Sequence, residues 1–266
     1  GTVEILFHKF ISNLSIQCIF KSSRKIIINS KLFINEKIFF IVEKVEKNYI
    51  TLSCRVNPMK YFTSYGEVPL PKYIKRKVTI DDRNRYQTVY AREDGSVAAP
   101  TAGLHFTNKI LSELQNKGVQ IEYLTLHVTY NTFKPISNDN YKIHDIGSES
   151  CSIDKSLMLK ISDTKKNDKK VYAVGTTVTR ALENYASKKY TDSFSGEADL
   201  YITPGYKFKV IDGIITNFHL PKSTLLLLVS SLICRKKLLS LYSIAIENEY
   251  RFYSYGDSMF LKNIKL

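Results

Sequence analysis

The sequence has few cysteines and no long hydrophobic stretch, and both shortages limit the class of protein. Its four cysteines lie far apart and form no C-x-x-C pair; they are Cys18, Cys54, Cys151 and Cys234. In a chain of 266 residues, free thiols are a better interpretation than two disulfides, and they favour the cytoplasm. The longest apolar run, 225–231, is much too short for a membrane span, because a spanning helix needs about 20 apolar residues. No membrane segment or signal peptide is therefore expected.

Motifs of the common catalytic and nucleotide-binding folds are also missing. The five histidines lie on separate segments, without an H-x-x-x-H or H-x-x-E-H pair; they are His8, His105, His127, His144 and His219. This spacing gives no metal signature, so we expect no metal cofactor. No G-x-S-x-G elbow supports a Ser-His-Asp hydrolase, and neither G-x-G-x-x-G nor G-x-x-x-x-G-K-[ST] occurs.

Acidic residues are scarce relative to basic ones. The chain has 39 Lys and Arg against 25 Asp and Glu, a net charge of +14, and a pI near 9.4. A surplus of this size indicates an anionic partner, with nucleic acid first and anionic lipid second. The 44% hydrophobic and 24% charged residues are typical of a soluble globular protein with one large domain or two modest ones.

Residues 1–63 have the pattern of a small domain of short strands. Runs of β-branched and aromatic residues, separated by Asn, Ser, Lys and Glu, occur at 26–28, 37–42 and 49–52. No long stretch in this part has helical periodicity. Strands this short and closely spaced predict a small antiparallel barrel or sandwich.

The pattern changes at 66–71 (GEVPLP), where two prolines impose an extended connection. We therefore predict two domains, 1–63 and 64–266. The second alternates helical and strand patterns, which predicts an α/β domain with a sheet layered by helices. The expected helices are 107–117 (capped by Thr107 and stopped by Gly118), 180–187, 223–233 and 237–250, and the expected strands are 119–128 and 171–174.

The segment 175–180 (GTTVTR) lies where a predicted strand passes into a predicted helix. Free N–H groups at the helix start, two hydroxyls and an arginine one turn later are suited to an anion or a ribose-like polyol. A tight turn with N-capping threonines explains the same residues without any ligand. Both interpretations are open at this point.

Two further segments place a histidine among small or polar residues. In 100–107 (PTAGLHFT), His105 precedes a helix N-terminus, which lowers the pKa of a histidine and favours the neutral imidazole. In 216–224 (TNFHLPKST), Asn217 and His219 alternate along an extended segment and share one face. Capping or packing is the commoner role for a lone histidine.

Seven long segments together resemble one family, the S-adenosylmethionine:tRNA ribosyltransferase-isomerases of queuosine biosynthesis. The matching blocks are GEVPLPKYI (66–74), RYQTVYA (85–91), GSVAAPTAGLHFT (95–107), LTLHV (124–128), AVGTTVTRALE (173–183), PGYKFKVIDGIITNFHLPKSTLL (204–226) and YRFYSYGDSM (250–259). They occur in the family's order and cover almost all of 66–260. Blocks of this length are far more specific than a single short motif.

The resemblance implies a fold and an activity. Family members have a small β-barrel inserted into a larger α/β domain. They consume S-adenosylmethionine as a ribosyl donor, move the ribosyl group to the preQ1 base at the tRNA wobble position, and isomerise it to give epoxyqueuosine, with release of adenine and methionine. The implied partner is preQ1-modified tRNA, with no metal and no membrane, and we expect a cytoplasmic monomer.

The reaction requires proton transfer and charge stabilisation. Because the sulfonium acidifies the neighbouring ribose carbon, a positioned base can remove a proton there. The resemblance implies catalytic roles for His105, His219, Glu149 and Asp257. The implied substrate-binding residues are Thr101, Gly103, His127, Gly175, Thr176, Thr177, Arg180, Asn217, Lys222, Ser223 and Tyr255.

A basic stretch beside the block at 85–91 is the predicted RNA track. It contains Lys75, Arg76, Lys77, Arg83 and Arg85. A protein that grips an anticodon stem-loop neutralises several phosphates, so its binding weakens steeply with salt. A merely solvated charged face is the alternative. The aromatic residues of 251–257 are typical either of a core or of a surface on which bases stack.

The chain also departs from the family pattern. Its start at Gly1 matches the beginning of the barrel, so the opening strands of the family's α/β sheet are expected to be absent. In the family's LHVGxGTF motif, Thr129 and Asn131 replace glycines, and in its H-x-M-H-x-E motif Gly147 replaces the second histidine, while His144 and Glu149 remain.

These departures leave alternatives to a working enzyme. One is a truncated or decayed homologue that keeps the scaffold and binds tRNA without catalysis. Another is a non-catalytic RNA-binding module, which the basic charge and the strand-rich domain would support by themselves. Release of adenine from S-adenosylmethionine separates both from the enzyme.

Overall fold

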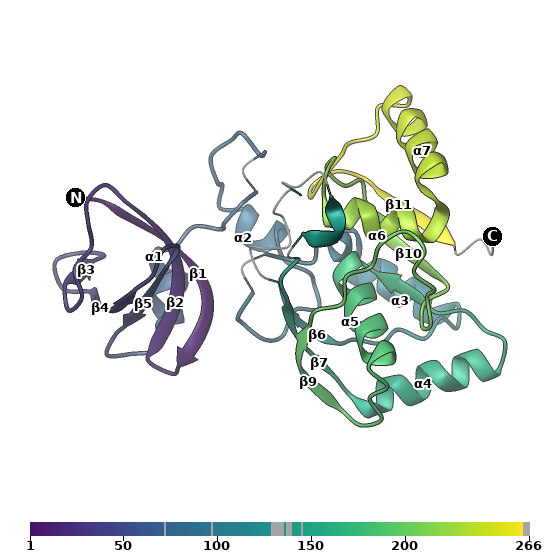
Figure 1. The fold of residues 1–266 in the computed structure, drawn as a ribbon, viewed down its shortest axis with the longest axis horizontal. Helices are drawn as coiled ribbons and strands as arrows, with labels where there is room; N and C mark the ends of the chain where they lie inside the picture. Colours follow the sequence, from purple (N-terminus) through teal and green to yellow (C-terminus); the bar gives the residue numbers. More distant parts are fainter. Residues whose placement is uncertain (72, 97, 129–135, 137–139, 145, 263–266) are drawn as a thin grey trace. The chain divides into compact units, whose positions relative to one another are not determined.

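The structure is a computed structural model that describes residues 1–71, 73–96, 98–128, 136, 140–144 and 146–262. It has a mixed α/β fold (Figure 1). The chain divides into two compact units, one of Gly1–Arg83 with Asp94–Ala98 and one of Asn84–Glu93 with Ala99–Leu266. The predicted boundary after residue 63 falls within the first unit and stays a prediction.

The first unit contains an antiparallel sheet. Its strands are β1 (Val3–Ser12), β2 (Ser15–Ser22), β3 (Lys31–Phe33), β4 (Phe39–Val45) and β5 (Tyr49–Ser53), hydrogen-bonded in the order β1-β2-β5-β4-β3. Alternate residues of β5 are buried, and Ile50 and Leu52 are fully enclosed, as expected of a strand with one face on a core. The predicted strands 37–42 and 49–52 are confirmed. The short helix α1 (Met59–Tyr65) adds Phe62, whose ring meets that of Phe7 edge-on.

The barrel predicted for this unit is not confirmed. Among the residues described, β1 and β3 each pair on one side only, and a closed barrel would require a pairing between the two. The predicted strand at 26–28 is wrong. Ile27 accepts a hydrogen bond from the Ser30 N–H, Asn29 has φ 67°, and Ile27 is 70% exposed. The run therefore forms a turn, because local hydrogen bonds outweigh a weak β preference.

The second unit contains two three-stranded sheets in its described part. One has the order β11-β10-β8, with β10 (Gly213–Asn217) antiparallel to β11 (Ser258–Lys262) and parallel to β8 (Tyr172–Val174). The other is antiparallel, with the order β6-β7-β9, from β6 (Thr125–His127), β7 (Glu149–Ile153) and β9 (Phe194–Ala198). This mixture of sheets and helices confirms the predicted α/β class. The absence of opening strands stays a prediction.

The remaining helices are α2 (Asp82–Arg85), α3 (Asn108–Asn116), α4 (Lys155–Lys166), α5 (Thr176–Ser187), α6 (Thr224–Ile233) and α7 (Arg235–Glu247). The predicted helices 107–117 and 223–233 match α3 and α6 closely. Helix α5 begins four residues before the predicted Arg180, α7 replaces the predicted 237–250, and α2 and α4 were not predicted. The Thr107 and Ser223 side chains accept hydrogen bonds from the backbone three residues later and cap α3 and α6, as predicted. In the described residues, no helix is both long enough and apolar enough to cross a membrane. The predicted strand 119–128 is reduced to 125–127.

Helix α5 is the central element of the second unit. It contacts β8 and β10 of one sheet and β9 of the other, as well as α6. Nine of its residues are buried, from Thr176 to Tyr185 with one half-buried exception, so the helix has no solvent face in its first two turns. A helix enclosed in this way carries buried polar side chains only where they have a task.

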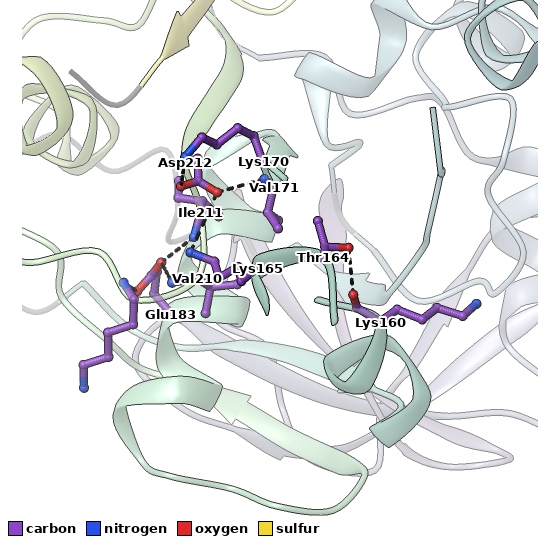
Figure 2. A network of polar contacts seen from close by, with 10 residues as sticks. Lys160, Thr164, Lys165, Lys170, Val171, Glu183, Val210, Ile211 and Asp212 are labelled. Carbon is purple, nitrogen blue, oxygen red and sulfur yellow. Dashed lines mark hydrogen bonds and ion pairs between the residues drawn. The ribbon is translucent and has the colours of Figure 1, made fainter. Parts of the chain in front are cut away.

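One such buried group, Glu183, holds a loop in place (Figure 2). Its carboxylate, fully buried, accepts hydrogen bonds from the Tyr206 hydroxyl and from the backbone N–H groups of residues 209, 210 and 211, at 2.9–3.1 Å. The neighbouring carboxylate of Asp212 accepts from the Val171 N–H at 2.9 Å and fixes the start of β8. These contacts set the entry into β10, whose far end carries the site.

Candidate active site

A pocket with about 350 Å³ of empty space lies in the second unit, where three segments that are distant in the sequence meet. They are the 3-10 helix η1 (Thr101–His105), the end of β10 and the N-terminus of α5. The polar residues that line it are Thr101, Thr176, Thr177, Thr216, Asn217 and His219, and apolar walls come from Ala99, Ala102, Val128 and Leu225. The structure thus brings together the two histidine-bearing segments and the threonine turn.

Asn217 links two of these segments through its side chain. Its Nδ2 lies 3.0 Å from Nε2 of His105, and its Oδ1 accepts a hydrogen bond of 3.0 Å from the Thr101 hydroxyl. With the amide donating through Nδ2, Nε2 of His105 is an acceptor and the ring proton lies on Nδ1. Partial burial lowers the pKa of His105, against the opposing charge of Asp257, so the imidazole is neutral at pH 7. His105 lies one hydrogen bond behind the pocket wall.

His219 is the second histidine and lies in the wall itself. Its Nε2 is 2.8 Å from the Thr216 hydroxyl, and its backbone N–H donates to the Tyr242 hydroxyl at 2.7 Å. Complete desolvation lowers the pKa of His219 to about 4. The ring is therefore neutral at physiological pH and fixed in orientation, which suits hydrogen bonding to a ligand better than proton transfer.

The shifted pKa of His219 predicts a pH-dependent stability. Above the unfolded pKa of 6.5, the ring is neutral in the folded and in the unfolded chain. Below pH 6.5, the unfolded chain binds a proton that the folded chain does not bind until about pH 4. The free energy of unfolding should therefore fall by up to about 3 kcal/mol between pH 7 and pH 4 from this group. Denaturant titrations of the parent and of His219→Gln at several pH values measure it. An unchanged slope in His219→Gln would contradict the assignment.

The threonine turn forms the N-terminus of α5. Gly175, at φ 98°, occupies a backbone region that favours glycine, and its N–H donates to the Ile215 carbonyl at 2.8 Å, which ties the turn to β10. The sequence predicted a helix start at Arg180. The helix begins at Thr176 instead, because residues 176–179 already hydrogen-bond as a helix. Thr176 and Thr177 line the pocket at a helix start whose first N–H groups have no intrahelical acceptor.

A second pocket, with about 280 Å³ of empty space, adjoins the first through Thr176, Thr177 and Leu225. It contains Arg180 and Glu149, whose Nη2 and Oε2 atoms lie 2.7 Å apart with both side chains buried. Two residues placed far apart in the sequence, and predicted for different roles, therefore form one ion pair.

Gly103 is fixed by close packing inside η1. A Cβ at this position would clash with the Tyr90 hydroxyl and with the Thr88 methyl group. Burial raises the pKa of Tyr90 to about 12, so its hydroxyl is protonated and in close contact with this turn. The observed role of Gly103 is packing of the pocket wall, and the substrate-binding role predicted for Gly103 stays a prediction.

Gly103→Ala is expected to lower the free energy of unfolding by about 1–3 kcal/mol, because the added methyl overpacks the turn. The second substitution Tyr90→Phe should restore part of this loss, since it removes the nearest clashing atom. Chemical denaturation of the two single variants and the double variant measures the coupling. Full additivity of the two losses would contradict the proposed clash.

Several predicted residues line neither of the two pockets. Asp257 is paired with Arg251, through Oδ1 at 3.0 Å and through the Arg251 N–H at 2.8 Å, and these contacts hold its pKa below the usual range. Tyr255 meets Tyr86 edge-on with ring centroids 5.6 Å apart. Lys222 is exposed with φ 55°, and Ser223 is the cap of α6. Their predicted roles stay predictions.

The departures from the family pattern lie on and beside β6 and β7. His127 is half-buried on β6, and its Nδ1 is buried without a hydrogen-bond partner in the described residues. Gly147 has φ 67°, so a glycine suits the position once held by histidine in the pattern. Thr129 and Asn131 lie outside the described residues.

Two arginines of the predicted RNA track have structural partners in the first unit. Arg76 makes two contacts of 2.7 Å with the buried carboxylate of Asp82. Arg83 donates to the backbone carbonyls of Thr63 and Gly66. Lys75 and Lys77 are exposed, and in the second unit the Arg85 guanidinium lies 5.8 Å from the Tyr255 ring centre.

Several residues that shape the site were not singled out from the sequence. Tyr242 and Tyr90 act through contacts with residues from other segments, for which no local pattern exists. The predicted pairing of Asn217 and His219 on one face correctly placed both in the pocket wall, and the hydroxyl in the same block could have suggested Thr216. In the described residues, no group of three or more His, Cys, Asp or Glu side chains is arranged to hold a metal ion.

The fold and the site together define an α/β protein whose polar pocket is built from a strand end, a 3-10 turn and a helix N-terminus. Comparison with known proteins identifies it further. The chain belongs to the family described as queuosine biosynthesis protein, which it matches over residues 1–261. The resemblance seen in the sequence is thereby confirmed, and it places the chain in a family of transferases that act in tRNA modification.

Individual relatives carry one name, S-adenosylmethionine:tRNA ribosyltransferase-isomerase. The chain is 49% identical to the protein of Halothermothrix orenii over 225 residues, or 82% of this chain and 65% of that protein. It is 42% identical to the protein of Vesicomyosocius okutanii over 98% of this chain and 77% of that one, and 41% identical to the protein of Francisella tularensis subsp. novicida over 91% and 72%.

A solved structure is also similar. It is the crystal structure of S-adenosylmethionine tRNA ribosyltransferase from Thermotoga maritima, with a TM-score of 0.50 and 26% identity. The match covers 98% of this chain and 75% of that one. The chain thus spans between 65% and 77% of the length of these proteins.

Proposed function

We propose that the chain transfers the ribosyl group of S-adenosylmethionine to preQ1 at the wobble position of tRNA and isomerises it to give epoxyqueuosine. Adenine and methionine are the other products. The observation that carries the proposal is the pocket that joins η1, the end of β10 and the start of α5. It gathers the neutral His219 ring, an amide and hydroxyls around one space, with His105 one hydrogen bond behind its wall. Such a set can orient a nucleoside and move a proton without bearing a net charge of its own.

The two histidines are suited to different tasks. His105 is only partly buried, and its neutral ring accepts a hydrogen bond at Nε2 from the Asn217 amide. It can accept a proton from the ribose carbon next to the sulfonium once that amide turns to the substrate. His219 has the lower pKa, about 4, and holds a fixed neutral ring for hydrogen bonding to the leaving adenine or to a ribose hydroxyl. Thr176 and Thr177 add N–H and hydroxyl donors at the helix start.

The tRNA is the proposed anionic partner that accounts for the chain's positive net charge. The net charge of +14 favours binding of a polyanion, and Lys75 and Lys77 are exposed lysines of the predicted track. Arg76 contributes by holding Asp82 and the loop that carries both lysines.

The double variant Lys75→Ala/Lys77→Ala should weaken binding to an anticodon stem-loop RNA and lower the slope of log affinity against log salt by about 2, one for each lost phosphate contact. Fluorescence anisotropy at several salt concentrations measures the slope. Lys37→Ala, which removes an exposed lysine of the same unit outside this stretch, is the matched control. Equal slopes for all three proteins would remove these lysines from the RNA track.

The proposal is tested by incubating the chain with S-adenosylmethionine and an anticodon stem-loop RNA that contains preQ1. We expect stoichiometric release of adenine and methionine, detected by liquid chromatography, and a mass gain in the RNA. The same RNA with guanine at the wobble position is the control and should release neither. RNA binding without adenine release would contradict the proposal.

Gly147 supports a second candidate function. A histidine of the family pattern is replaced there by a glycine whose φ of 67° fits the backbone, so the change leaves the scaffold intact while removing an imidazole. A homologue that binds tRNA without catalysis would show salt-sensitive RNA binding and no adenine. Restoring the histidine with Gly147→His would then be expected to restore turnover.

A further inference from the structure

The second pocket of the site has a different character from the first. The two pockets share Thr176 and Thr177, so a ligand in one can extend into the other. The second pocket is walled by aliphatic side chains, among them Ile202 and Leu228, and contains one pair of opposite charges, Arg180 and Glu149. It therefore combines apolar walls with a single pair of opposite charges.

The charged pair is buried, and the guanidinium of its arginine is incompletely satisfied. The Arg180 and Glu149 side chains are 6% and 2% exposed, and a buried ion pair stabilises a fold poorly unless further hydrogen bonds complete it. Nη2 of Arg180 lies 2.7 Å from Glu149 Oε2, yet the angle does not make a hydrogen bond, and no other acceptor among the described residues reaches it. This guanidinium can donate to a ligand in the pocket.

Two helix N-termini strengthen the preference of this pocket for a carboxylate. Thr176 begins α5 and Thr224 begins α6, and both residues line the pocket. The first N–H groups of a helix have no intrahelical acceptor and favour negative charge. A simple anion would nevertheless meet the repulsion of Glu149, so the pocket as a whole selects against a ligand that carries negative charge alone.

We propose that this pocket binds the α-amino acid end of S-adenosylmethionine, with the α-carboxylate on Arg180 and the α-ammonium on Glu149. A zwitterion matches a buried pair of opposite charges, and the aliphatic walls suit the methylene groups that connect it to the sulfonium. The inference rests on the proposed function, since it assigns one end of that substrate. It makes Glu149 a binding residue rather than a proton-transfer group.

The test uses three small probes that differ at one group each. L-Methionine carries both charges, methioninol lacks the carboxylate, and 4-(methylthio)butanoate lacks the ammonium. Isothermal titration of the whole chain should give binding of L-methionine at least about tenfold tighter than that of either analogue, because each charged hydrogen bond contributes separately. Equal binding of the three probes, or no binding of L-methionine at millimolar concentration, would overturn the proposal.

Two conservative variants locate the charges. Glu149→Gln should reduce the preference for L-methionine over 4-(methylthio)butanoate to about threefold or less. Arg180→Lys should do the same for its preference over methioninol, because lysine lacks the planar fork. Exposed residues provide matched controls, Glu197→Gln and Arg235→Lys, which should keep both preferences. These ratios compare ligands on one protein, so a uniform loss of folded protein does not change them.

The proposed function and this inference fail separately. If adenine is released but Glu149→Gln and Arg180→Lys both keep the parent's preferences among the three probes, the ribosyl transfer stands and the assignment of this pocket is wrong. If the preferences change as expected but no adenine appears with preQ1-containing RNA, the pocket assignment stands and the proposed reaction is wrong.

Discussion

His105→Ala is expected to lower the rate of adenine release by about 100-fold or more, because a positioned general base contributes roughly 10²–10⁴-fold. The imidazole is neutral, and its unprotonated Nε2 can take a proton once the Asn217 amide that donates to it turns to the substrate. The parent rate should fall only below pH 6.5, since the pKa of His105 lies under this value and the protonated ring cannot act as a base. Single-turnover assays across pH 5–8 measure both effects.

His8→Ala is the matched control for loss of an imidazole. His8 belongs to the first unit, where its ring lies 4.9 Å from that of Tyr49, and this variant should retain the parent's rate and pH profile. A His105→Ala rate within a few-fold of the parent would remove His105 from proton transfer and direct attention to His219.

Glu183→Ala is expected to destabilise the second unit by roughly 3–5 kcal/mol, the cost of breaking a buried polar network. The substitution leaves the Tyr206 hydroxyl and the N–H groups of residues 209–211 without their acceptor. In a chain of this size, such a loss lowers the melting temperature by about 10 °C. Differential scanning calorimetry measures the shift.

Two comparisons isolate the effect of the Glu183 carboxylate. Glu183→Gln keeps one acceptor oxygen and should lose less stability than Glu183→Ala, and Glu247→Ala, at the exposed end of α7, should be nearly neutral. If Glu183→Ala and Glu247→Ala melted within about a degree of each other, the carboxylate would have no anchoring role.

The parts of the fold that could be predicted are those with local signals. Thr107 and Ser223 mark helix starts because capping depends on residues three apart, and the strand at 49–52 follows from its β-branched and aromatic residues. The run 26–28 has the same β-branched composition as a strand but forms a turn, since Asn29 adopts a positive φ and Ser30 hydrogen-bonds back. Propensity alone does not distinguish the two outcomes.

Some of the predicted site residues line one pocket, whereas the contacts among them could not be predicted. Asn217 and His219 share one face as expected, and the threonine turn does open a helix. The link from Asn217 to His105 spans 112 positions and the pair Arg180–Glu149 joins a helix to a strand of another sheet, so neither has a local pattern. Arg76 looked like an RNA contact because it is basic, but its partner Asp82 is visible only in the folded loop.

A double-label experiment tests the proposed reaction most directly. The chain is incubated with S-adenosylmethionine that carries tritium in the ribose and carbon-14 in the methyl group, together with a preQ1-containing anticodon stem-loop RNA. Our account predicts that tritium enters the RNA while carbon-14 is recovered in free methionine. Carbon-14 in the RNA, or RNA that binds and stays unlabelled, would contradict it.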